Sequence, residues 1–132
     1  MGRWSRRKVL AASLLLPGSA LRAAQGSRLD QQPVELADEL TGRALERLTD
    51  LKLLFHFPHY HHRFLAANNR SLILGGEADG TRQIHFHDLR RNRTTQLTDG
   101  EGTFSYSATM DDGEKDLFYL QGDGLNRTSP CR

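Results

Sequence analysis

The chain is poor in the residues and motifs on which several common kinds of site depend. Its single cysteine, Cys131, excludes an internal disulfide and a cluster of thiolate metal ligands. The sequence has no phosphate-binding glycine loop and no Gly-x-Ser-x-Gly nucleophile elbow. Nucleotide hydrolysis and serine esterase chemistry therefore have no motif here.

Acidic residues are absent from residues 1–24, although the whole chain has 16. Basic residues, including Arg6 and Arg7, precede an apolar run over residues 9–16 that is too short to span a bilayer. Small residues follow at Ser19, Ala20, Ala23 and Ala24. The order predicts a cleavable signal peptide over residues 1–24, and Arg6-Arg7 resembles the twin-arginine export motif. We expect a periplasmic or exported bacterial protein with no stable membrane anchor after cleavage. A disordered basic arm is the alternative.

The basic balance of the chain comes from this leader. Five of the 18 basic residues lie in residues 1–24, and the formal net charge of the chain is +2. Cleavage would leave 13 basic and 16 acidic residues, a net charge of −3. A basic isoelectric point is therefore no argument for binding nucleic acid, and we predict no nucleic-acid partner.

Two segments of the chain repeat earlier ones. Leu97-Thr98-Asp99 repeats Leu48-Thr49-Asp50, and residues 116–119 correspond to residues 71–74. A period of about 40 to 50 residues with several short strands is typical of β-propellers, which close with about four to eight blades. Residues 38–132 have room for about two such blades. We predict an all-β fold, an incomplete β-propeller of about two blades, and interpret the chain as a fragment.

The turn signals divide the chain into short elements. We predict a linker over residues 25–37. The apolar residues of 34–48 have helical spacing, but Gly42 interrupts it, so we predict a short helix followed by a strand at about 43–49. One continuous helix is the alternative. The predicted strands of the first blade cover residues 63–67, 71–75, 82–87 and 93–98, and those of the second cover residues 104–109 and 116–120. We expect the remaining strands of the second blade to be missing or distorted.

All six histidines lie between residues 56 and 87. His59 and His61 have the spacing for one face of a strand and could both be metal ligands there. Loop histidines in contact with solvent are the more common case. His85 and His87 are interpreted as surface strand residues, because zinc requires three or four ligands. Residues 111–113 are interpreted as a tight turn and not as a calcium loop.

Several of these motifs, taken in order, resemble the amino-terminal blades of oligogalacturonate lyases. The resemblance runs from about Asp38 to Leu120. It rests on Thr41-Gly42, residues 47–49, Phe64, residues 68–76, Asp88-Leu89, residues 95–100 and Thr103-Phe104. It implies a seven-bladed propeller that cleaves oligogalacturonate by β-elimination during pectin degradation, with manganese bound by the full-length protein. A non-enzymatic TolB-like propeller for protein interaction in the cell envelope is the alternative.

The resemblance transfers few functional residues. The family's manganese ligands and catalytic histidine lie in later blades, so it implies no catalytic and no metal residue here, and an isolated chain without activity. His56, Tyr60 and His62 lie where the family has a histidine, an aromatic residue and a polar residue, and we expect them to contact sugar. The strand edges that an unclosed propeller exposes also predict self-association, and a chain without a stable fold is a third possibility.

Overall fold

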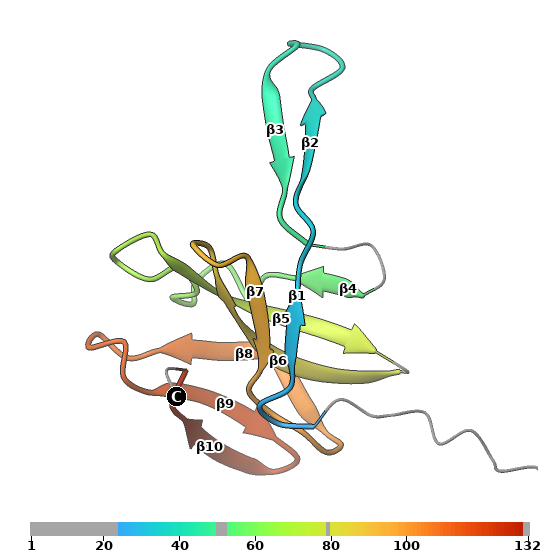
Figure 1. Cartoon of the computed structure of the whole chain (residues 1–132). Coiled ribbons are helices and arrows are strands. Elements are labelled where there is room, and N and C mark those ends of the chain that lie inside the picture. Colours follow the sequence, from blue (N-terminus) through green and yellow to red (C-terminus); the bar gives the residue numbers. More distant parts are fainter. Residues whose placement is uncertain (1–23, 50–52, 79, 131–132) are drawn as a thin grey trace, which may run out of the picture.

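A computed structural model describes residues 24–49, 53–78 and 80–130 (Figure 1). Arg6, Arg7 and Cys131 lie outside these residues. All described elements are strands, which confirms the all-β class. Among the described residues there is no helix that could span a membrane. The strands are β1 (Arg28–Asp30), β2 (Val34–Ala37), β3 (Ala44–Arg47), β4 (Leu54–His56), β5 (Ser71–Ala78), β6 (Thr81–Asp88), β7 (Arg93–Gln96), β8 (Thr103–Met110), β9 (Leu117–Gln121) and β10 (Gly124–Thr128).

The larger sheet has five antiparallel strands in the order β1-β7-β6-β5-β4. The turns between its strands lie where asparagine and glycine predict them. Asn69, Gly80 and Asn92 have the positive φ angles that these residue types tolerate best. The predicted strands at 71–75, 82–87 and 93–98 are confirmed as β5, β6 and β7. The predicted strand at 63–67 is wrong: only an isolated bridge between Leu65 and Leu72 forms there.

The smaller sheet has three antiparallel strands in the order β10-β9-β8. The predicted strands at 104–109 and 116–120 are confirmed as β8 and β9. The expectation that further strands would be missing or distorted is wrong for β10, which pairs with β9 over its whole length. The register between β8 and β9 shifts between Phe104 and Thr109, so a bulge interrupts β8.

β2 and β3 form a separate antiparallel hairpin that projects away from both sheets (Figure 1). The short helix predicted at its start is wrong, whereas the strand predicted at about 43–49 is confirmed as β3. Residues 25–37, predicted as a linker, contain β1 and β2. Asp38 explains the turn, because its Oδ1 accepts hydrogen bonds from the Thr41 N–H and Oγ1 at 2.7 and 2.6 Å. Gly42 follows with a φ of 67°, so it turns the chain and does not continue a helix.

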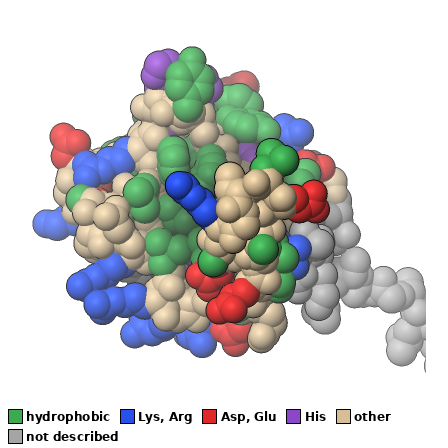
Figure 2. Space-filling model, turned by 90° about the horizontal axis from the view of Figure 1, so that it is seen from above, with side chains coloured by type: hydrophobic (Ala, Val, Ile, Leu, Met, Phe, Trp, Pro, Cys, Tyr) green, Lys and Arg blue, Asp and Glu red, His purple; other side chains and the backbone are tan. Residues whose placement is uncertain are grey.

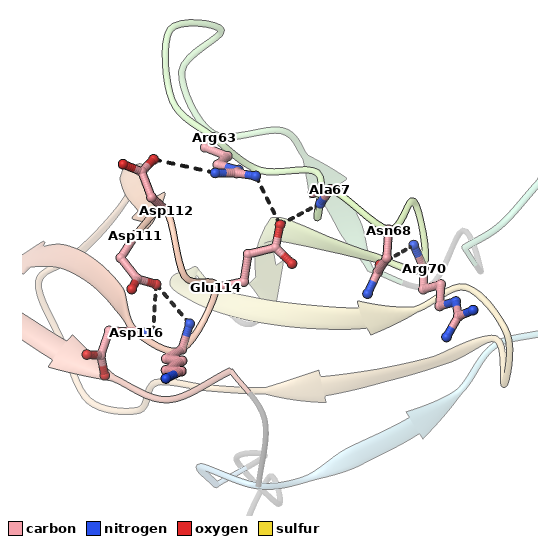
Figure 3. A network of polar contacts seen from close by, with 9 residues as sticks. Arg63, Ala67, Asn68, Arg70, Asp111, Asp112, Glu114 and Asp116 are labelled. Carbon is pink, nitrogen blue, oxygen red and sulfur yellow. Dashed lines mark hydrogen bonds and ion pairs between the residues drawn. The ribbon is translucent and has the colours of Figure 1, made fainter.

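The hydrophobic core lies between the two sheets. Ile73 and Ile84 from the larger sheet and Ala108 and Leu117 from the smaller one are fully buried. Polar contacts join the turn between β8 and β9 to the segment before β5 (Figure 3). In these contacts Glu114 accepts hydrogen bonds from Arg63 and from the backbone N–H of Ala67. The predicted turn at residues 111–113 is confirmed, with Asp111 Oδ1 accepting from two following backbone N–H groups.

Candidate functional site

The candidate site is built around His56, the last residue of β4. Across the ladder His56 faces Gly75 of β5, where any β-carbon would collide with the imidazole ring. The His56 Nε2 lies 3.0 Å from the Ser105 hydroxyl, and its ring stacks on Tyr106 with centroids 4.4 Å apart. Burial, with a contribution from Arg82, lowers the pKa of His56, so the ring is neutral at neutral pH. His56 is thus a held, uncharged hydrogen-bonding group.

The segment that follows, residues 57–62, is attached to the bulge of β8. The His59 N–H donates to the Tyr106 carbonyl at 3.1 Å, and His62 Nδ1 donates to the same oxygen at 3.1 Å. Tyr60 is 78% exposed, and its ring lies against those of His59 and His61. The loop therefore presents an open aromatic ring beside histidines.

A cation lies close to the ring of Tyr106. The Arg82 guanidinium is 5.9 Å from the Tyr106 ring centroid, and its Nε is 3.2 Å from the Glu77 carboxylate. Exposed aromatic rings suit the apolar faces of sugars, and a guanidinium suits a carboxylate. The arrangement of Tyr60, Tyr106 and Arg82 fits an acidic sugar better than a neutral apolar ligand.

The structure brings all three predicted sugar-contacting residues to one region. His56 and His62 contact the Ser105–Tyr106 segment, and Tyr60 belongs to the same loop. Sequence reasoning missed Ser105, Tyr106 and Arg82. Arg82 lies 20 residues after His62, and Ser105 and Tyr106 lie 43 and 44 residues after it. No local motif marks them, so only the packing of β8 against β5 and β6 of the larger sheet reveals them.

The loop histidines do not form a metal centre. His59 and His61 have ring centroids 5.2 Å apart, yet the described residues contain no group of three or more His, Cys, Asp or Glu side chains arranged to hold a metal ion. Metals in proteins need about three or four such ligands. The described residues thus do not fit a manganese ion, and we derive no catalytic step through a metal from them.

The interpretation of His85 and His87 as surface residues is wrong. They are 4% and 0% exposed, and His87 Nδ1 lies 2.9 Å from the Thr94 hydroxyl. The His85 ring meets Phe55 edge-on at 5.4 Å. Burial lowers the pKa of both residues, that of His85 to about 4. Both histidines therefore belong to the packed interior and not to the site.

This chain is similar to known lyases. A sequence model of the family described as oligogalacturonate lyase matches residues 23–128. The oligogalacturonate lyase of Dickeya dadantii (strain 3937) is 26% identical over 98 residues, and the oligogalacturonide lyase of Pectobacterium atrosepticum is 24% identical over the same length. Each match covers 74% of this chain and 25% of the relative, so the chain spans about a quarter of these relatives.

Solved structures agree with the sequence relatives. An oligogalacturonate lyase in complex with manganese superimposes with a TM-score of 0.74 at 27% identity, over 80% of this chain and 28% of that one. An oligogalacturonate lyase from Vibrio parahaemolyticus gives a TM-score of 0.75 with the same coverage, and its 21% identity supports the fold alone. With a family match over residues 23–128, the chain belongs to the oligogalacturonate lyase family.

Proposed function

We propose that this chain is the amino-terminal part of an exported lyase that cleaves oligogalacturonates by β-elimination in pectin degradation. The family match over residues 23–128 carries this proposal. The chain spans about a quarter of its relatives, so the proposal assigns it a part of the enzyme, with the remainder supplied by later blades. All the named matches are lyases, so the alternative of a TolB-like binding module has no support from them.

The chemistry of β-elimination explains why sugar binding and cleavage can lie in different blades of the enzyme. A base removes the C5 proton of a uronate, and the C4 oxygen leaves. This proton is weakly acidic until cations offset the negative charge that develops on the neighbouring carboxylate. A related lyase was solved in complex with manganese, which would supply such a cation. Because the described residues offer no three-ligand group, we expect this chain alone to bind sugar without cleaving it.

The part played by this chain is contact with the sugar. Tyr60 offers an exposed ring to a pyranose face, and His62 keeps its Nε2 for a hydroxyl because Nδ1 is bonded to the Tyr106 carbonyl. His56, neutral and held by Ser105, lines the same region. Arg82 attracts the uronate carboxylate, although Glu77 offsets part of its charge.

Titration of the full chain with trigalacturonate, followed by NMR, tests this proposal. We expect shifts centred on residues 57–62 and Tyr106, and much weaker ones with neutral galactotriose. Tyr60→Ala should weaken binding about tenfold, equivalent to about 1.4 kcal/mol. Leu54→Ala is the matched control, since Leu54 is exposed on neighbouring β4.

The same preparation is assayed for lyase activity with manganese and digalacturonate, by the absorbance of the unsaturated product. No product is expected. Product formation by this chain alone would show that the base and the metal ligands lie within it. Equal shifts with the acidic and the neutral sugar, or none at the loop, would contradict the assignment of the sugar-contacting residues.

A further inference from the structure

The bulge of β8 is larger than a single extra residue. Phe104 pairs with Leu120 and Thr109 pairs with Phe118, so five steps along β8 lie opposite two steps along β9. Residues 105–108 form this bulge. The unpaired residues of a bulge turn their side chains and carbonyl groups away from the ladder. The bulge therefore leaves part of β8 available for contacts with elements other than β9.

The side chain of Ser107 bridges the ladder where this bulge begins. Its Oγ accepts a hydrogen bond from the Leu120 N–H at 2.8 Å and donates one to the Phe104 carbonyl at 2.6 Å. Phe104 and Leu120 are directly opposite each other in the register, so the hydroxyl joins two groups that could otherwise bond directly. Two hydrogen bonds in series hold the backbones farther apart than one direct bond does. Ser107 thus keeps β8 displaced from β9 at this point.

The residues that the bulge displaces contact β4 and the loop over residues 57–62. Ser105 is fully buried, and its hydroxyl lies 3.0 Å from His56 Nε2. The Tyr106 carbonyl accepts hydrogen bonds from the His59 N–H and from His62 Nδ1, both at 3.1 Å. A carbonyl oxygen has two lone pairs, so this one atom satisfies both donors. The bulge therefore supplies partners for His56 and for the loop.

The loop that depends on these contacts is exposed. Tyr60 is 78% exposed, and His59 and His61 are exposed beside it. In Figure 2 histidine side chains lie next to hydrophobic ones on a projecting margin of the surface. A loop with few buried apolar contacts opens easily, so the hydrogen bonds that it makes decide how well it is ordered. The two bonds to the Tyr106 carbonyl are bonds of this kind.

One of these bonds also fixes the tautomer of the His62 ring. A carbonyl oxygen only accepts hydrogen bonds, so His62 Nδ1 carries the hydrogen. In the neutral ring Nε2 is then the acceptor. If the Tyr106 carbonyl moved away, both tautomers would become available. The position of this carbonyl thus determines which ring nitrogen is left for a ligand.

We propose that Ser107 is a positioning residue for the loop over residues 57–62. Its hydroxyl keeps the bulge open, and the open bulge holds the Tyr106 carbonyl against the loop. The carbonyl in turn orders the loop and fixes the tautomer of His62. Ser107 acts through Tyr106 and does not need to touch the ligand. That the ligand is an acidic sugar rests on the proposed function, whereas the bulge and the tautomer do not.

Three variants of the full chain separate the hydroxyl from other effects. Ser107→Ala removes the bridge, so Phe104 and Leu120 can bond directly and the bulge can close. Ser107→Thr keeps a hydroxyl on the same β-carbon in a residue type that suits strands. Thr109→Val is the matched control, because it removes a hydroxyl from β8 where pairing with β9 has resumed.

Two measurements without sugar report the position of the Tyr106 carbonyl. Nitrogen-15 NMR of the imidazole rings gives the tautomer of His62, and hydrogen exchange gives the protection of the His59 amide. We expect Ser107→Ala to show a mixture of tautomers and to exchange the His59 amide about tenfold faster than wild type. Ser107→Thr and Thr109→Val should match wild type in both measurements.

Titration with trigalacturonate measures the consequence for binding. A loop that is not held in advance must be ordered when the ligand binds, so Ser107→Ala should weaken binding about threefold to tenfold. Ser107→Thr should restore the wild-type affinity. Urea unfolding is the control for loss of the fold, and it should change little because the bridge lies at the exposed surface.

Three outcomes would overturn the positioning role. The first is a wild-type His62 ring with its hydrogen on Nε2, which needs no variant to fold. The second is Ser107→Ala with the wild-type tautomer and slow His59 exchange, and the third is Ser107→Thr behaving like Ser107→Ala. Wild type that binds no trigalacturonate but gives the expected tautomer and exchange results would reject the sugar assignment and support the positioning role.

Discussion

At the residue scale, the histidines divide into two chemically different groups. His59 and His61 lie in an exposed loop, whereas His85 and His87 are inside the protein. The pattern His85-Phe86-His87 places both imidazoles on one face of β6, and that face is covered. Sequence alone favours the phenylalanine face as the buried one. The structure instead shows polar rings in the interior, with the Thr94 hydroxyl as a neighbour of His87.

His85 should make the stability of the protein depend on pH. Its pKa is about 4 in the folded chain and 6.5 as the ordinary value, so the unfolded chain binds more protons between these pH values. The contribution of neutral His85 to the free energy of unfolding is complete above pH 6.5 and is lost as the pH falls toward 4. The total loss is about 3 kcal/mol. Urea unfolding of His85→Gln across this range should show a shallower decline than wild type.

His59→Phe is the control for this measurement, because it removes a histidine from the exposed loop. Its unfolding is measured at the same pH values, so that the effect of replacing His85 is separated from that of replacing a histidine elsewhere. If His85→Gln and wild type lose stability in parallel as the pH falls, His85 is not the source of the pH dependence of the free energy of unfolding.

At the element scale, turns were predicted well and pairings between distant segments were not. Asn69, Asn92 and Gly80 carry the positive φ angles that their residue types predict. The strand predicted at about 43–49 is present as β3, but β2 was mistaken for a helix because the apolar spacing of residues 34–48 also fits one. The pairing of β2 with β3 and the hydrogen bonds to Asp38 decide for a hairpin. The segment 63–67 was mistaken for a strand because its contacts divide between Ser71 and Met110, which a local pattern does not show.

The turn between β8 and β9 offers a matched pair of substitutions (Figure 3). Glu114, with a side chain 22% exposed, accepts hydrogen bonds from Arg63 and Ala67. Asp112 reaches the same arginine at 3.5 Å, but its side chain is fully exposed. Glu114→Ala should therefore lower the free energy of unfolding by about 1 to 2 kcal/mol, and Asp112→Ala by less than about 0.5 kcal/mol.

Urea unfolding of both variants measures this difference. Equal losses in the two variants would mean that the bond to the Ala67 backbone contributes nothing, and that Glu114 acts only as one more surface charge.

At the scale of the whole molecule, the candidate site depends on neighbouring sheets. His56, Tyr60 and His62 were predicted from a resemblance, but what holds them is Ser105 and Tyr106 of the second sheet, 49 and 44 residues away from their partners. Sequence reasoning identified the exposed loop and missed its support, because that support exists only once β8 packs against β5 and β6 of the larger sheet. A repeat reveals that sheets recur; it does not reveal which side chains meet between them.

The charge of the whole molecule leads to the last prediction, which concerns export. Residues 1–24 hold five basic and no acidic residues, and the remainder has a net charge of −3, so the two parts differ in sign. If residues 1–24 are a twin-arginine signal, they should direct a folded reporter to the bacterial periplasm, and the reporter should be cleaved near residues 20–24. Arg6→Lys with Arg7→Lys keeps every charge and should abolish export, whereas Arg3→Lys should not. Cell fractionation and amino-terminal sequencing measure this. A reporter that stays in the cytoplasm with the unaltered leader, or one exported equally well with both lysines, would show that residues 1–24 are a basic arm without a twin-arginine signal.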